Sequence, residues 1–149
     1  MTKDVESTPP LRRLLTLCLS QHFGIEDAAF QTYIAEQADY LEVVSGEYLL
    51  RDGEHSDEVF FLLTGHLRAL KTVPPKTEPQ ILGEIGRGET VGELAMFTGR
   101  PRSADVIAIR DCVVARISRD VMESAIAQQP TVAIQITKQI IHRFERAQA

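Results

Sequence analysis

The sequence predicts a mainly β domain, a barrel or sandwich of short strands, with helices at both ends of the chain. Two observations support this fold class. From about residue 40 to residue 117, short apolar runs recur at regular spacing, separated by turn residues such as glycine and proline; this pattern is typical of all-β folds. On either side of this region, apolar residues fall at helical spacing instead.

Length and composition fit one soluble globular domain. The chain has 149 residues, 44% of them hydrophobic and 25% charged. Its net charge of −5 argues against a nucleic-acid-binding surface. The apolar stretch from Leu14 to Ser20 is far shorter than the ~20 residues of a membrane span, so we expect no membrane insertion. Cys18 and Cys112 cannot build a disulfide framework, which predicts a reduced, cytoplasmic protein.

The N-terminal region predicts a tail followed by two helices. Residues 1–10 are polar, end in two prolines and are expected to be flexible. Helical spacing of apolar residues begins at Leu11, and a second helical pattern follows Gly24. In that second pattern Glu26 and Asp27 are expected in the first turn, where the helix dipole favours acidic side chains. The predicted helices cover about residues 11–38.

The predicted β region covers about residues 40–117. The turn Arg110-Asp111 lies between its last two runs, which are expected to pair as a hairpin. The apolar runs are Leu41–Val44, Glu47–Leu50, Glu58–Leu63, His66–Thr72, Gln80–Ile85, Ala104–Ile109 and Cys112–Ile117.

The C-terminal region, about residues 119–146, is expected to be helical. Ser118 is a favourable N-cap for one helix, which Pro130 ends. A last helix is expected over Thr131–Arg146. Every second residue from Val132 to Ile136 is apolar, which is a strand pattern, but the apolar residues further on favour the helix.

The segment from residue 88 to residue 108 has the residue types of an anion site. Gly92 and Glu93 open a short helix-compatible stretch, and the first amides of a helix lack partners within it. Arg102 follows ten residues later and could fold back as a forked donor, with the Ser103 hydroxyl beside it. Glu93 would accept hydrogen bonds from the hydroxyls of a sugar. Singly, each residue is typical of an ordinary turn or solvated loop; the joint spacing predicts a site for one phosphate and a ribose.

This segment resembles the phosphate-binding cassette of cyclic nucleotide-binding domains. Those cassettes read Phe-Gly-Glu-(Leu/Ile)-Ala, a short connection, and Pro-Arg-(Ala/Ser/Thr)-Ala. Here Val91 stands where Phe or Ile is common; we call residues 91–104 the cassette. The resemblance continues upstream and covers about Ile25 to Phe144. The matching residues are Gly92, Glu93, Leu94, Ala95, Pro101, Arg102, Ser103 and Ala104, with Gly46, Gly53, Glu54, Val59, Phe60, Phe61 and Gly65 before them.

The resemblance implies an eight-stranded β-roll or jelly roll and a non-enzymatic sensor of cyclic AMP or cyclic GMP. It implies that Arg102 pairs with the cyclic phosphate and that Glu93 accepts from the ribose 2′-OH. The ligand would be a regulator, so no cofactor or metal is expected. The other implied ligand-binding residues are Gly92, Leu94, Ala95, Ser103 and Ala104 of the cassette, Leu82 and Val91 near the purine, and Leu63 on the inner wall of the roll.

The resemblance leaves the base, the lid and the partner open. Ser103 is compatible with either nucleotide, with a slight preference for cyclic AMP. In the family, a residue of the last helix often caps the base, so the lid here is Phe144, Arg143 or absent. We expect Thr131–Arg146 to pack closer to the cassette when nucleotide binds and to signal to an unidentified effector, and a homodimer stays open.

Two alternatives remain from the sequence. The same roll could be a structural or protein-interaction module that binds no nucleotide. A cupin-type enzyme shares the jelly-roll outline but needs clustered metal ligands. The four histidines form no His-x-His pair; they are His22, His55, His66 and His142.

Overall fold

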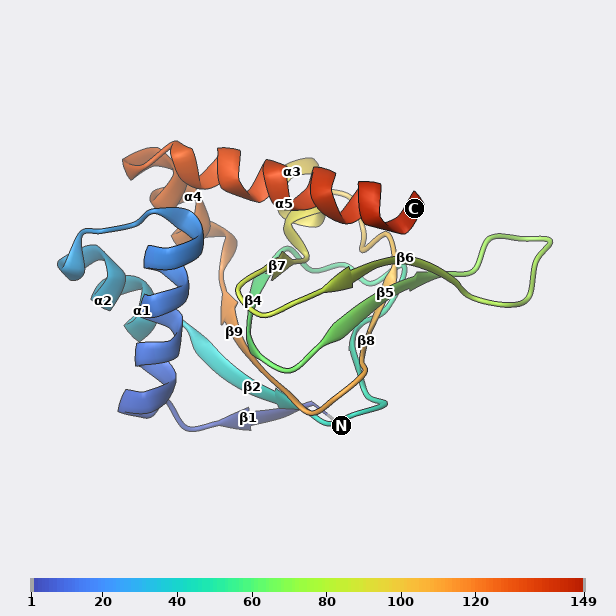
Figure 1. The fold of residues 1–149 in the computed structure, drawn as a ribbon, viewed down its shortest axis with the longest axis horizontal. Coiled ribbons are helices and arrows are strands. Elements are labelled where there is room, and N and C mark those ends of the chain that lie inside the picture. The colour runs from blue at the N-terminus through green and yellow to red at the C-terminus, as the bar shows by residue number, and fades with distance from the viewer. Residues whose placement is uncertain (1, 149) are drawn as a thin grey trace.

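The computed structural model describes residues 2–148, within which nine strands form two antiparallel sheets packed as a roll (Figure 1). One sheet has the order β1-β2-β9-β4-β7 and the other β3-β8-β5-β6. The strands are β1 (Lys3–Val5), β2 (Asp39–Val43), β3 (Tyr48–Leu50), β4 (Val59–Thr64), β5 (Leu67–Lys71), β6 (Gln80–Ile85), β7 (Thr90–Val91), β8 (Asp105–Ala108) and β9 (Cys112–Ile117). The helices are α1 (Pro9–Phe23), α2 (Ala28–Gln37), α3 (Glu93–Thr98), α4 (Arg119–Gln128) and α5 (Thr131–Gln148).

Strand β4 separates two hydrophobic clusters because successive side chains of a strand point to opposite faces. Phe60 and Leu62 face the interior between the two sheets, where they join a cluster with residues of β2, β6 and β8. Val59, Phe61 and Leu63 face the other way and pack against the helices. Both faces of this strand are therefore covered, which explains why its apolar run is continuous rather than alternating.

Helices α1, α2 and α4 and the first half of α5 cover the outer face of the five-stranded sheet. Phe23 at the end of α1 packs edge-on against Phe61, with ring centroids 5.1 Å apart. Thr8 and Asp27 cap α1 and α2 by accepting from backbone amides. Asp27 is thus an N-cap, not the first-turn residue that the sequence predicted. Ser118 caps α4 in the same way, as predicted.

The predicted tail needs correction, and one short strand was not predicted. Within residues 2–10, the described part of the predicted tail, β1 pairs with β2 and α1 already begins at Pro9, so this part is not a free tail. Proline is favourable in the first helical turn, where its missing amide is not needed. The two-residue β7 was not predicted, because so short a strand has no periodicity.

The expected hairpin between the last two strands is also wrong. β8 pairs with β3 and β5, whereas β9 pairs with β2 and β4 in the other sheet. The turn at Arg110-Asp111 is therefore a corner at which the chain passes from one sheet to the other. A local turn signal cannot show which distant strand each arm will pair with.

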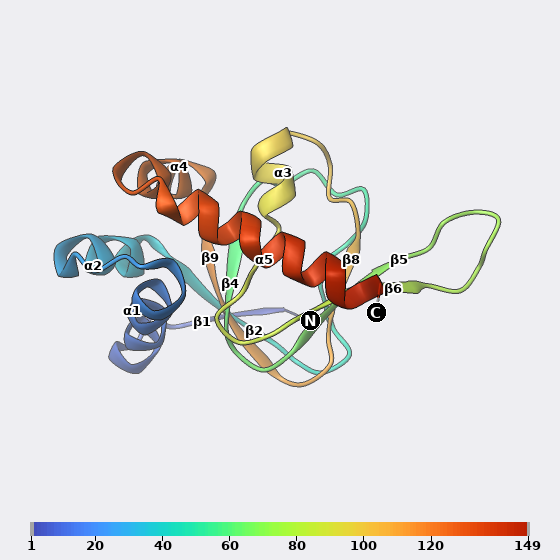
Figure 2. The same ribbon diagram turned by 45° about the horizontal axis from the view of Figure 1, so that its top comes forward.

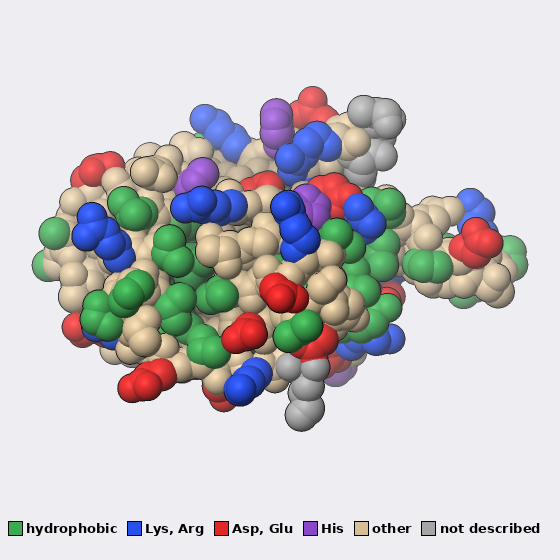
Figure 3. Space-filling view, turned by 60° about the horizontal axis from the view of Figure 1, so that its bottom comes forward, with side chains coloured by type: hydrophobic (Ala, Val, Ile, Leu, Met, Phe, Trp, Pro, Cys, Tyr) green, Lys and Arg blue, Asp and Glu red, His purple; other side chains and the backbone are tan. Residues whose placement is uncertain are grey.

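The helical interpretation of the chain after Pro130 is confirmed. α5 runs for 18 residues and crosses the roll beside α3 (Figure 2). Val132 and Ile136, two of the residues that suggested a strand, lie one helical turn apart and are buried. Within residues 2–148, no helix is long and apolar enough to cross a membrane. The β5–β6 hairpin projects from the body of the molecule, and the face in Figure 3 carries acidic, basic and apolar side chains interspersed.

Candidate functional site

A cavity of about 360 Å³ lies between the four-stranded sheet, the cassette and α5. Its walls are mostly apolar, and the charged side chains that reach it are Glu93, Arg102 and Arg143. An apolar cavity with a few convergent polar groups is the usual form of a small-molecule site. The lining residues are Leu50, Ala69, Ile81, Leu82, Val91, Gly92, Glu93, Leu94, Ala95, Arg102, Ser103, Ala104, Val106, Ile140, Arg143 and Phe144.

Arg102 is held in place by the loop between β3 and β4. Its side chain is buried, with the whole residue 4% exposed. Nε donates to Ser56 Oγ at 2.9 Å, Nη2 to the Glu58 carbonyl at 2.9 Å and Nη1 to the Gly92 carbonyl at 2.8 Å. Burial lowers the pKa of this guanidinium, and the carboxylate of Glu58 opposes that shift most strongly. An arginine has five N–H donors, so two remain for an anion in the cavity.

Gly92 permits the arginine to come this close. Its φ is +88°, a left-handed conformation that favours glycine. A Cβ atom at this position would lie 2.6 Å from Nη1 of Arg102 and 3.1 Å from the Glu58 carbonyl oxygen. The same residue is the N-cap of α3. Glycine therefore both starts the cassette helix and leaves room for the guanidinium.

Glu93 is the most deeply buried charge of the site, at 2% exposure. Oε1 accepts from Nη1 of Arg143 at 3.3 Å, whereas Oε2 has no hydrogen-bond partner among the described residues. Burial raises the pKa of Glu93, and the guanidinium of Arg143 counters part of that rise. A buried carboxylate with only one oxygen hydrogen-bonded to the protein is suited to accept a hydrogen bond from a ligand hydroxyl through the other oxygen.

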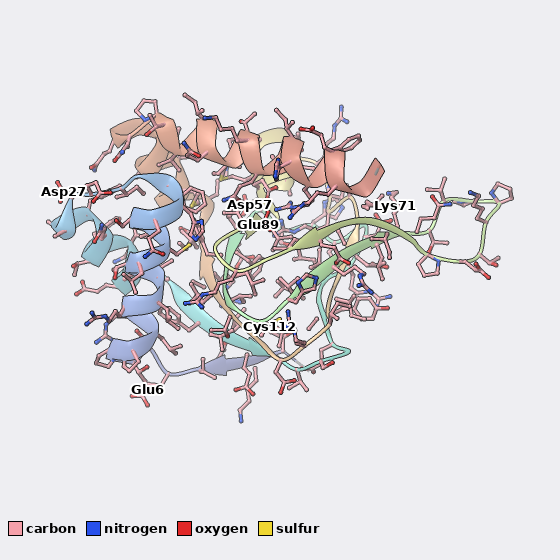
Figure 4. All side chains as sticks on the ribbon, viewed as in Figure 1. Glu6, Asp27, Asp57, Lys71, Glu89 and Cys112 are labelled. Atoms are coloured by element: carbon pink, nitrogen blue, oxygen red, sulfur yellow. The ribbon has the colours of Figure 1, made fainter. Side chains whose placement is uncertain are left out.

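Helix α5 closes the cavity from the opposite side. Nη2 of Arg143 donates to the Thr90 carbonyl at 2.6 Å, while Nε of the same residue is buried without a partner in residues 2–148. The side chain crosses β6 at Gly83, where a Cβ would lie 2.5 Å from Cγ of Arg143. Further along α5, Arg146 forms an ion pair with Glu89 at 3.3 Å. Figure 4 labels Glu89 below α5.

The structure brings most of the predicted site residues to this one cavity. All the predicted cassette residues line it, as do Leu82 and Val91. Arg143 and Phe144, the two candidate lid residues, line it as well. The expectation for Leu63 is wrong: it belongs to the helix-facing cluster. β4 alternates, and Leu63 shares the face of Phe61 rather than that of Leu62.

Sequence reasoning missed the remaining apolar wall. These residues lie on five different elements, and strand or helix periodicity indicates burial without showing which cavity a residue lines. The missed residues are Leu50, Ala69, Ile81, Val106 and Ile140.

The histidines and carboxylates form no metal site in the described part of the chain, which holds no cluster of three or more potential metal ligands.

Comparison with known proteins identifies the family. The model of the cyclic nucleotide-binding domain family matches residues 40–129, so the chain belongs to this family. Its sequence is similar to lysophospholipase nte1 of Aspergillus fumigatus, with 34% identity over 106 residues. That match covers 71% of this chain and 7% of the relative, so the chain spans a small part of the length of the curated relatives it matches.

Solved structures show the same fold. A cyclic nucleotide-binding domain from Methylobacillus flagellatus superposes with a TM-score of 0.81 at 22% identity, covering 98% of this chain and 85% of that chain. The regulatory domain of Toxoplasma gondii protein kinase A, solved with cAMP, superposes with a TM-score of 0.70 at 21% identity. That match covers 80% of this chain and 46% of the kinase chain.

Replacing Gly92 with alanine should destabilise the protein more than the same change at Gly46. Both glycines have φ near +90°, but a Cβ at Gly46 meets nothing within 4 Å. Gly46→Ala should therefore cost only the left-handed strain of about 1–2 kcal/mol. Gly92→Ala should cost more, because it also displaces Arg102. Urea unfolding measures both, and equal losses would contradict the close packing described for Gly92.

Proposed function

We propose that the chain binds a cyclic nucleotide in the cassette cavity and acts as a regulatory module, not as a catalyst. The observation that carries this proposal is the pair of buried, oppositely charged side chains, Arg102 and Glu93, on one wall of a mostly apolar cavity. Burying a charged side chain costs free energy unless the charge is paired and hydrogen-bonded. A ligand with a phosphate, a sugar hydroxyl and a base offers a partner to each part of the wall: the phosphate to Arg102, the hydroxyl to Glu93 and the base to the apolar side chains.

The charge of the cavity favours a phosphodiester. Arg102 and Arg143 contribute two positive charges, and Glu93 in its ionised form contributes one negative charge. The remaining single positive charge matches a cyclic phosphate, which carries one negative charge. An open nucleotide monophosphate carries close to two charges at neutral pH, and the second would stay unpaired in a poorly solvated site.

The unpartnered polar atoms support the same ligand. Glu93 Oε2 needs a donor, which the ribose 2′-OH provides. Nε of Arg143 needs an acceptor, which a ring nitrogen of either purine or the exocyclic oxygen of guanine provides. Both atoms belong to residues that line the cavity. In this arrangement the amides of Leu94 and Ala95 face the phosphate together with the free donors of Arg102.

The base would lie against the apolar part of the cavity. Leu82 and Val91 form one wall, and Ile140 and Phe144 of α5 cover it. These side chains recognise a purine by shape and contact area, so the wall itself distinguishes adenine from guanine weakly. The Ser103 hydroxyl is compatible with both. We favour cyclic AMP, the ligand that the similar Toxoplasma regulatory domain was solved with.

The comparisons support a regulatory role in a larger context. The curated relative is named a lysophospholipase, and the region similar to this chain is 7% of it. The similar solved chains include a kinase regulatory domain and the sensor domain of a transcriptional regulator from Pseudomonas aeruginosa. We propose that this chain passes ligand occupancy to an effector through α5.

Arg102 should dominate the affinity. Arg102→Ala removes a charge-assisted contact worth roughly 1.5–3 kcal/mol, which is about 10- to 150-fold in Kd. Arg102→Lys should recover only part, because lysine lacks the fork. Calorimetric titration with cyclic AMP and cyclic GMP measures the effect, and circular dichroism checks folding.

The exposed Arg100, two residues earlier, is the matched control for this titration. Arg100→Ala should bind as the wild type does. Equal affinity of Arg102→Ala and wild type would remove the phosphate assignment. Absence of binding by the wild type itself would favour the interaction-module alternative.

Glu93→Gln should weaken binding of a cyclic nucleotide but not of its 2′-deoxy analogue. The carboxylate accepts strongly from the 2′-OH, whereas an amide oxygen accepts less strongly; removing a hydrogen bond to a charged group costs roughly 1.5–3 kcal/mol. The deoxy analogue lacks this hydroxyl, so its Kd should change little. Titration of both ligands with both proteins gives the comparison. An equal loss for the two ligands would show that Glu93 acts on the structure of the cassette instead.

Ligand binding should protect α5 against hydrogen exchange. Ile140, Arg143 and Phe144 line the cavity, so a bound base adds contacts to this helix and should slow its local opening. The interior strands should change little, because the clusters on both faces of β4 are already packed. Mass-spectrometric exchange with and without cyclic AMP tests this. If protection rises at the cassette alone, α5 is not the element that responds, and the N-terminal helices take its place.

A further inference from the structure

Strand β7 leads directly into the cassette and forms an open edge of its sheet. It is the last strand in the order β1-β2-β9-β4-β7 and pairs only with β4 among the described strands. On the β4 side, Gly88 and Glu89 of the preceding turn exchange backbone hydrogen bonds with Leu62. The outer side of an edge strand presents unpaired amide and carbonyl groups, which need partners when they are buried.

Two side chains of α5 take the place of a further strand at this edge. Gln139 Oε1 accepts from the Thr90 amide at 3.0 Å and from Thr90 Oγ1 at 3.3 Å. Nη2 of Arg143 donates to the carbonyl of the same threonine at 2.6 Å. Gln139 and Arg143 are four residues apart and therefore lie on one face of the helix. Thr90 itself is completely buried.

Gln139 also reaches the turn before β7. Its Nε2 donates to the Gly88 carbonyl at 3.4 Å. The same carbonyl accepts from the thiol of Cys18 on α1 at 3.6 Å. One amide side chain therefore joins α5 to the backbone on both sides of Glu89. The cassette begins one residue after Thr90, at Val91.

We propose that Gln139 is a positioning residue that clamps β7 to α5 and thereby sets the geometry of the cassette. It is not among the residues that line the cavity, so its effect on binding passes through the backbone of Thr90. Arg143 joins the same clamp but also reaches Glu93. Replacing Gln139 therefore tests the clamp without removing a side chain that lines the cavity. The affinity part of this inference rests on the proposed function, whereas the clamp itself does not.

Gln139→Met tests the clamp because methionine keeps the length of the side chain and removes its hydrogen bonds. Gln135→Met is the matched control. Gln135 lies one helical turn earlier, and its side chain makes no hydrogen bond within residues 2–148. The loss of one hydrogen bond corresponds to a change of about 3- to 10-fold in an equilibrium constant.

Site-resolved amide exchange by NMR is measured first, without nucleotide. In Gln139→Met the amide of Thr90 should exchange about 3- to 10-fold faster, while the amides of Val59 and Phe61 in β4, which lie opposite β9 residues, keep their rates. The control should match the wild type at all three amides. Unchanged exchange at Thr90, or equally faster exchange throughout β4, would overturn the clamp, because the first shows no hydrogen bond and the second shows general destabilisation.

Calorimetric titration with cyclic AMP and cyclic GMP then tests the link to the site. Gln139→Met should raise the Kd about 3- to 10-fold, and Gln135→Met should leave it unchanged. Faster exchange at Thr90 with an unchanged Kd would overturn the positioning role. If the wild type binds neither nucleotide, the proposed function fails, and the exchange of Thr90 still decides whether Gln139 clamps β7.

Discussion

The burial of charge beside an apolar cavity is the constraint on which this structure depends. A guanidinium out of water must find acceptors for most of its donors, and Arg102 finds them on the loop between β3 and β4 and on the carbonyl of Gly92. This requirement fixes the loop, and the loop in turn fixes the start of α3. The left-handed Gly92 is a consequence of the same constraint, because a side chain there would occupy the place of the arginine.

The same constraint explains why α5 belongs to the site and not only to the helical layer. Glu93 is buried to 2% exposure, and the cation that pairs with it comes from α5. α5 is therefore attached to the cavity by charge and to the edge of the sheet by hydrogen bonds, while Val132 and Ile136 attach its first half to the hydrophobic cluster below. A ligand that alters the charge balance at Glu93 acts directly on the ion pair between Glu93 and Arg143, which holds the second half of α5 at the cavity.

The sequence predicted the parts of the molecule that local patterns determine. Capping residues and apolar spacing located α4 and α5, and the joint spacing of Gly92, Glu93 and Arg102 located the charged wall of the cavity. Contacts between distant segments were out of reach. Whether β8 and β9 pair depends on strands far away in the chain, and the role of Gln139 depends on where α5 lies across the roll. Leu63 was misplaced for a similar reason, since a register error of one residue moves a side chain to the opposite face.

The buried carboxyl group of Glu93 belongs to the candidate site, and its negative charge lowers the stability of the fold. Burial raises the pKa of Glu93 in the folded protein, so the folded state holds this proton more tightly than the unfolded chain does. The contribution of Glu93 to stability is therefore present below the ordinary pKa of a glutamate and is lost as pH rises through the folded-state pKa. In the folded protein this carboxyl group is buried and paired through one oxygen only. A hydroxyl donated to the second oxygen stabilises the charged form and lowers that pKa again, so binding at this position and deprotonation of Glu93 reinforce each other.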